Sequence, residues 1–69
     1  MKTARQQLTA KIEERDTATL IELAHELNLK TSTEEMLVSC EISNVLEARL
    51  SPADFVELMY ILEEELIAA

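Results

Sequence analysis

Apolar residues recur every three or four positions along most of this 69-residue chain. That spacing is typical of amphipathic helices, and no stretch alternates apolar and polar residues for long enough to suggest a strand. Glycine is absent and proline occurs once, so nothing interrupts most of these segments. The pattern predicts an all-α fold, a small bundle of about four helices in a single domain, at residues 4–14, 17–27, 33–50 and 52–68.

The two N-terminal helices are the least sharply separated of the four. No glycine or proline lies between them, so they could be continuous, although Asp16 is a competent N-cap for the second. Thr3 and Gln6 have the spacing of a capping box at the start of the first. Its apolar stripe is narrow, so we expect it to be the least firmly docked; it consists of Ala4, Leu8 and Ile12. The wider stripe of the second consists of Leu20, Leu23, Ala24 and Leu27, with Ile21 at its margin.

The ends of the second helix and both ends of the third carry recognisable signals. Asn28 tolerates the left-handed conformation and is expected to end the second helix. Two overlapping capping boxes begin the third, at Thr31 with Glu34 and at Ser32 with Glu35. The main apolar stripe of the third helix is Val38, Ile42, Val45 and Leu46, and further apolar residues surround it: Met36, Leu37, Cys40, Ala48 and Leu50. An all-round distribution of this kind predicts a central helix that packs on more than one side.

The start of the fourth helix is the clearest local signal in the chain. Ser51 can cap it, Pro52 suits the first helical position, and Asp54 places negative charge near the positive end of the helix dipole. The core face predicted for this helix consists of Phe55, Leu58, Met59, Leu62 and Leu66.

Charge narrows the classes of partner. The chain has 6 basic and 14 acidic side chains and a net charge of −8. Residues 1–15 carry +2, which leaves −10 for residues 16–69. Nucleic acids and anionic membrane surfaces are bound through Lys and Arg, so both are disfavoured. The polar N-terminus, the single cysteine and the lack of a long apolar run predict a cytoplasmic location.

A helix-turn-helix is an alternative interpretation of residues 23–35, because Leu23, Ala24 and Asn28 suit its first helix and turn. The expected recognition helix, however, would present Glu34 and Glu35 to phosphates, which is electrostatically unfavourable. A nucleic-acid-binding regulator with a degenerate motif therefore stays a minor alternative. An acidic chain can also imitate DNA toward an enzyme that handles DNA, or serve as a structural subunit.

No set of residues predicts catalysis, a cofactor or a metal. His25 is interpreted as an exposed residue near a helix end, and Cys40 as a buried apolar one. A zinc site needs three or four converging ligands, which the sequence does not supply. Neither a nucleophile and base pair nor a glycine-rich phosphate loop is evident. We therefore expect a protein that is not an enzyme, without cofactors or metals.

Two flanks of the fourth helix are candidate interaction surfaces. One predicts self-association as a homodimer, through Val56, Tyr60 and Ile67. Glu63 shares that flank and would have to lie at the rim or meet a cation such as Arg49. The other flank suits a basic protein with an apolar anchor, and consists of Asp54, Glu57, Ile61, Glu64 and Glu65. Together they predict a small acidic protein-binding regulator, adaptor or inhibitor.

Overall fold

The computed structural model describes residues 3–69 and contains four helices in that range: α1 (Ala4–Glu13), α2 (Thr17–Asn28), α3 (Thr33–Arg49) and α4 (Pro52–Ala68). The predicted all-helical class is confirmed, and every helix end lies within one residue of its predicted position. The first two helices are separate. A short connection ends in Asp16, whose carboxylate accepts the backbone N–H of Thr19 at 2.8 Å and so begins α2.

The helix starts are set by side chains that the sequence identified. Thr3 and Gln6 form the predicted reciprocal capping box, with distances of 3.1 and 2.9 Å. Of the two overlapping boxes before α3, the structure uses Ser32 as the N-cap. Ser51 caps α4, and its hydroxyl accepts the N–H of Asp54 at 3.2 Å. Each cap satisfies a backbone donor that the first turn of a helix leaves unpaired.

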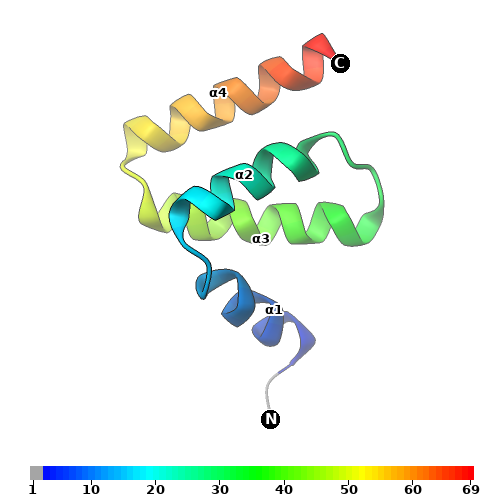
Figure 1. The fold of residues 1–69 in the computed structure, drawn as a ribbon, viewed down its shortest axis with the longest axis vertical. Helices are drawn as coiled ribbons and strands as arrows, with labels where there is room; N and C mark the ends of the chain where they lie inside the picture. The colour runs from blue at the N-terminus through cyan, green and yellow to red at the C-terminus, as the bar shows by residue number, and fades with distance from the viewer. Residues whose placement is uncertain (1–2) are drawn as a thin grey trace.

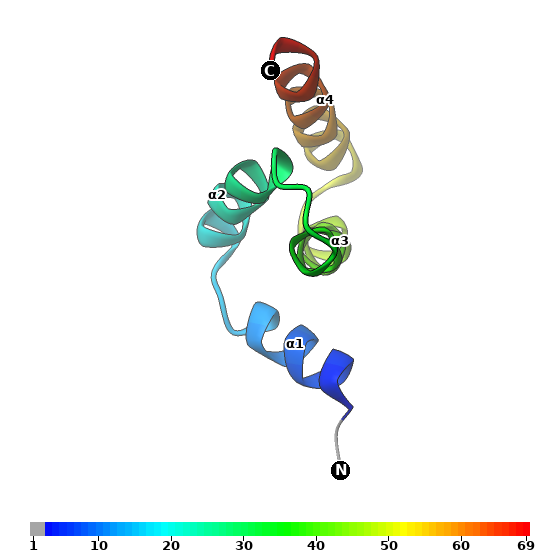
Figure 2. The same cartoon turned by 90° about the vertical axis from the view of Figure 1, so that its right-hand side faces the viewer.

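The helices are arranged around α3. Helices α2 and α3 lie side by side and run in roughly opposite directions, while α4 returns across them after a short link (Figure 1, Figure 2). Helix α1 extends from the opposite side of α3 as an arm (Figure 2). Because α3 contacts each of the other three helices, the predicted central role of this helix is confirmed.

The core is formed where α2, α3 and α4 meet, with one contribution from α1. Its most deeply buried large side chains are Leu20, Ile42 and Leu46. The other buried members are Ile12, Ala24, Val45, Leu58 and Leu62. All eight belong to the stripes that the sequence predicted.

Leu66 is a wrong core prediction, because its side chain is exposed. The periodicity of α4 places it in line with Leu58 and Leu62, but that helix diverges from α3 toward its C-terminus (Figure 1). Its last turns therefore lie too far from α3 for a side chain at position 66 to join the core. The angle between two helices is a tertiary property that helical periodicity does not contain.

Candidate interaction surfaces on the fourth helix

A polar cluster fixes the position of α4 against α2. The Asn28 side-chain amide donates to the Leu62 carbonyl oxygen at 2.8 Å and to Glu65 Oε1 at 3.3 Å. His25 Nδ1 lies 2.7 Å from Glu65 Oε2. We call His25, Asn28 and Glu65 the α2–α4 latch. These contacts align α4 at specific atoms, which apolar packing alone does not do.

The latch corrects two predictions. His25 is not a lone exposed side chain, because it is half-buried against Glu65. Asn28 does not end α2 in the left-handed conformation: it is the last residue of the helix, and no described residue has a positive φ angle. The partner of His25 is 40 residues away in the sequence, and that of Asn28 is 34 residues away. The hydrophobic periodicity of a single helix could not reveal contacts of this kind.

The flank predicted for self-association lies on the outside of α4. Val56, Tyr60 and Ile67 are 53%, 64% and 79% exposed, respectively. Phe55 and Met59 are half-buried between this flank and the core, and together with Glu63 they border a shallow hollow of about 160 Å³. Three large apolar side chains therefore face solvent along one side of one helix. We call Val56, Tyr60 and Ile67 the outer flank.

One of the five residues predicted for the acidic surface of α4, Glu65, belongs to the latch. Asp54, Glu57 and Glu64 are exposed, and Ile61 is 42% exposed among them. Glu65, predicted as part of the same surface, is half-buried and directed to His25 and Asn28. The structure thus brings four of the five residues to the surface and gives the fifth an intramolecular partner. We call Asp54, Glu57, Ile61 and Glu64 the acidic flank.

Arg49 binds the end of α1 and does not contact Glu63. Its guanidinium donates to the backbone carbonyl oxygens of Glu13 and Arg15, both at 2.7 Å. Carbonyls at the end of a helix lack intrahelical partners, so Arg49 caps α1 and holds the connection to α2. A cation for Glu63 in a dimer would therefore have to come from another residue, or Glu63 would have to stay at a solvated rim.

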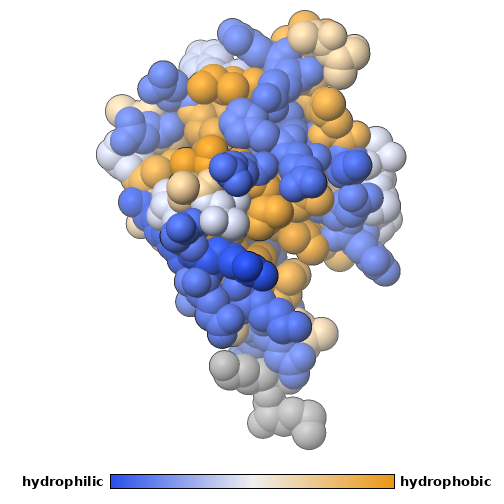
Figure 3. All heavy atoms as spheres, in the orientation of Figure 1, coloured by the Kyte–Doolittle hydropathy of each residue, from blue (hydrophilic) through white to orange (hydrophobic). Residues whose placement is uncertain are grey.

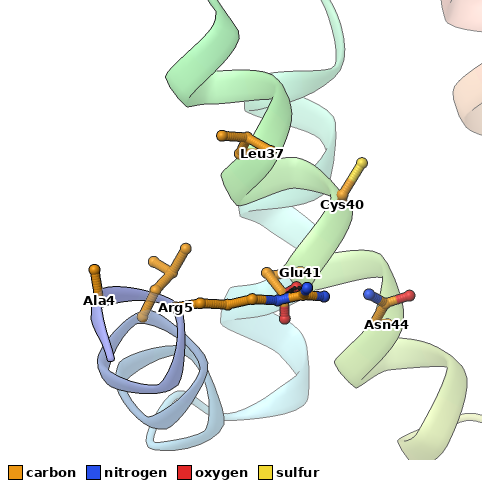
Figure 4. A pocket seen from close by; sticks show the side chains of 7 residues that line it. Ala4, Arg5, Leu37, Cys40, Glu41 and Asn44 are labelled. Atoms are coloured by element: carbon orange, nitrogen blue, oxygen red, sulfur yellow. Dashed lines mark hydrogen bonds and ion pairs between the residues drawn. The ribbon is translucent and has the colours of Figure 1, made fainter. Parts of the chain in front are cut away.

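The α1 arm is attached to α3 by polar contacts beside its narrow apolar stripe. The Arg5 guanidinium lies 2.9 Å from Glu41 Oε1, and the Thr9 hydroxyl donates to Glu41 Oε2 at 3.1 Å. Figure 4 shows Arg5 extending from α1 toward Glu41 on α3, with Leu37 beside the opening between the helices. Arg5 is mostly solvent-exposed, so this pair adds little stability and serves to orient the arm.

Cys40 is exposed, which contradicts the prediction of a buried residue. It occupies the outer side of α3, whereas Ile42 and Leu46 point to the core. Its neighbours Met36 and Leu37 are also exposed. The sequence had marked all three as apolar residues outside the main stripe, and that was the available signal for a further surface.

The described residues contain neither a group of metal-ligating side chains nor a membrane-spanning helix. Within residues 3–69, no three His, Cys, Asp or Glu side chains are grouped so that they could hold a metal ion. In the same range no helix is long and apolar enough to cross a membrane. One carboxyl has a shifted pKa: hydrogen bonds from the Thr19 side chain and backbone lower the pKa of Asp16. This shift reflects helix capping and not a reactive site.

The α2–α3 pair does not have the geometry of a helix-turn-helix. In that motif the two helices cross at about 90–120°, whereas α2 and α3 are roughly antiparallel (Figure 1). Glu34 also stands exposed in the first turn of α3, where a recognition helix would approach phosphates. These observations favour the interpretation of the pair as a helical hairpin.

Several large apolar side chains are exposed on the surface of the described residues. In the view of Figure 3, hydrophobic side chains gather over the region of α2, α3 and α4, while α1 is mostly hydrophilic. Comparison with protein-family models, curated proteins and solved structures gives no significant match to this chain.

Proposed function

We propose that this chain is a protein-binding regulator, adaptor or inhibitor without catalytic activity, and that it works as a homodimer. The observation that carries the proposal is the outer flank of α4, where Val56, Tyr60 and Ile67 are all more than half exposed on one side of a helix. Such contiguous apolar surface on a small domain is typical of a binding site. An acidic flank on the same helix supplies a second, chemically different surface.

The exposed area of the chain supports self-association. A folded monomer of 7.8 kDa is expected to expose about 4,400 Å². This chain exposes 5184 Å², an excess of about 800 Å². A stable interface of standard size buries about 800 Å² on each partner. One symmetric contact would therefore bring the exposed area to that of an ordinary small protein.

The outer flank is the proposed two-fold contact. A symmetric dimer would pair this apolar surface with its own copy, with Tyr60 near the middle because it lies between Val56 and Ile67 along the helix. Glu63 belongs at the solvated rim, since Arg49 is engaged at the end of α1. Two chains of charge −8 repel each other, so added salt should strengthen the dimer.

The acidic flank is proposed to bind a basic protein. Asp54, Glu57 and Glu64 surround the half-exposed Ile61, which offers an apolar anchor within a negative field. Carboxylates of this kind increase the rate of encounter with a basic partner. The Ile61 side chain, once the partner covers it, supplies most of the affinity. Glu65 contributes indirectly, because it holds the helix in place through His25.

Sedimentation equilibrium at micromolar concentration tests the proposal. The expected result is twice the monomer mass of 7.8 kDa, with the dimer dissociating in the Tyr60→Glu variant. Ile61→Glu is the matched control, because it places the same charge on the acidic flank of the same helix, outside the outer flank, and should leave the mass unchanged. A wild-type monomer that stays cooperatively folded on dilution contradicts the dimer.

Affinity capture with the immobilised chain tests the choice of partner. A basic protein that is retained by the wild type and lost from an Ile61→Gln, Glu57→Gln variant supports the acidic flank. Retention of a DNA-handling enzyme, released by added duplex DNA, would favour the DNA-mimic alternative instead. Retention of nucleic acid alone would contradict the proposed class.

A further inference from the structure

A groove opens where α3 and α4 move apart. The two helices are joined by a short link and diverge from it (Figure 1). The C-terminal end of α2 contributes to the wall of the groove. The groove has a volume of about 410 Å³ and takes residues from all three helices and from the α2–α3 loop. Its lining includes Leu29, Lys30, Met36, Cys40 and Leu66. We call it the α3–α4 groove.

The groove presents apolar side chains that have no partner in the core. Leu29, Met36 and Leu66 are each more than half exposed, and they come from three different segments of the chain. This surface is distinct from the outer flank, because none of its lining residues belongs to that flank. Large apolar residues that converge on one concavity are the usual floor for the apolar face of a helix.

Negative charge lies beside this apolar surface. Glu26 precedes Leu29 by three positions, and Glu63 precedes Leu66 by three. Residues three apart in a helix are neighbours on its surface, and both glutamates are exposed. We therefore expect Glu26 and Glu63 to lie beside the groove on α2 and α4, outside its lining residues. Lys30 is the one cation among its lining residues.

We infer that the α3–α4 groove binds a cationic amphipathic helix of a partner protein. Apolar residues of that helix, spaced three and four apart, would contact Leu29, Met36 and Leu66, and its Lys or Arg side chains would lie near Glu26 and Glu63. The inference rests on the proposed protein-binding function and adds the partner's structure and charge. Lys30 determines the orientation of the bound helix. The C-terminal end of that helix carries partial negative charge and is therefore expected beside Lys30.

Charge favours a cationic helix over a second copy of the chain at this groove. Each copy carries −8, and the body formed by residues 16–69 carries −10. A second copy in the groove would bring like charges together beside Glu26 and Glu63, whereas a cationic helix would neutralise them. Salt should consequently weaken binding at the groove, the opposite of its expected effect on the α4 dimer.

A model peptide makes the inference testable. The probe is an amphipathic helix of leucine and lysine, about 15 residues long so that it can fold, with one tryptophan on its apolar side. The chain has no tryptophan and one tyrosine, so fluorescence excited at a wavelength that only tryptophan absorbs reports the peptide alone. A peptide with glutamate in place of lysine tests charge, and one with the same composition but scrambled order tests amphipathicity. We expect only the first to bind tightly.

Cys40 supplies a built-in measure of location. It is the chain's one cysteine, it is exposed, and it borders both the groove and the opening between α1 and α3. Protection of its thiol is therefore read together with the Met36→Gln, Leu66→Gln variant, which changes the groove alone. Bound peptide should protect its thiol from alkylation by iodoacetamide. Binding that leaves the alkylation rate unchanged would overturn the inference, since the peptide would then lie elsewhere. Alkylation that slows as the protein concentration rises without peptide would also overturn it, because a second copy would be the occupant.

Substitutions separate the groove from the other surfaces. Met36→Gln with Leu66→Gln should reduce the peptide affinity about tenfold or more, since two apolar contacts are lost. Tyr60→Gln on the outer flank and Ile61→Gln on the acidic flank are controls that should bind normally. All four side chains are exposed, so the fold should persist, as circular dichroism can verify. Loss of binding in Ile61→Gln alone would overturn the inference and leave the proposed function standing.

The dimer is measured independently of the peptide. If sedimentation gives a monomer while the peptide binds and protects Cys40, the proposed homodimer fails and the groove is supported. If the dimer forms but the peptide neither binds nor protects Cys40, the groove is rejected and the dimer is retained.

Discussion

The α2–α3 hairpin and α4 use their apolar residues in different ways. The hairpin supplies five of the buried side chains, including the three most deeply buried, Leu20, Ile42 and Leu46. Helix α4 has the same length as α3 but buries only Leu58 and Leu62. It is held in addition by the polar α2–α4 latch. The hairpin therefore provides the stable core, while α4 is a presented helix with apolar surface left for partners.

Truncation of the hairpin core should have the largest effect. Leu46→Ala removes a fully buried side chain at the centre of the molecule and should lower the free energy of unfolding by about 2–5 kcal/mol. Leu66→Ala on α4 is the matched control, because its side chain is exposed and lies outside the outer flank, and it should change the stability by less than about 0.5 kcal/mol. Urea denaturation of both variants measures the difference. Equal losses would show that the last turns of α4 are packed as firmly as the hairpin.

Removal of the latch should have an intermediate effect confined to α4. Asn28→Ala leaves the Leu62 carbonyl and Glu65 without the amide donor, at a cost of about 1–3 kcal/mol. Amide hydrogen exchange should accelerate in α4 far more than in α3, because the latch lies outside the hairpin core.

A double-mutant cycle with Glu65→Gln tests whether the latch acts as one unit. Since Asn28 and Glu65 contact each other, their effects should not add. Additive losses, or uniform acceleration of exchange across all helices, would contradict a separately docked α4.

Local signals in the sequence predicted the helices and most of the core. Capping residues such as Ser51 act within three positions, and the stripe of α3 follows from its own periodicity. The latch and the α3–α4 groove were not predicted, because they depend on how α4 crosses α2 and α3. Cys40 and Leu66 were misplaced for the same reason. The outer flank is exposed in the structure as its helical position implies; its role in self-association stays a prediction.

Loss of the α4 cap should have a smaller effect than loss of the latch. Ser51→Ala removes the acceptor for the Asp54 N–H and should cost about 1 kcal/mol. Ser51→Asp keeps an acceptor at the N-cap and should retain most of the stability. Thermal unfolding compares the three proteins. If alanine and aspartate destabilise equally, the cap does not determine how α4 begins.

The smallest effect is expected at the start of the hairpin, and it should depend on pH. Hydrogen bonds from the Thr19 side chain and backbone lower the pKa of Asp16 in the folded chain, and Arg49 contributes in the same direction. A carboxyl with a lowered pKa stabilises the fold above its unfolded pKa, and this contribution is lost as pH falls through the lower folded value. The relevant range therefore begins near the ordinary value of 3.8 and extends below it.

Asp16→Asn isolates this titration from those of the other carboxyls. Asparagine is an equally good N-cap but has no charge to lose. The stability of the wild type relative to the variant should be constant near neutral pH and should decline as the solution is acidified past 3.8. Urea unfolding at a series of pH values measures the difference. A difference that stays constant through this range would mean that the Asp16 carboxylate contributes no more than a neutral cap. The start of α2 would then be held by the hydrogen bonds of its cap and not by the charge of the carboxylate.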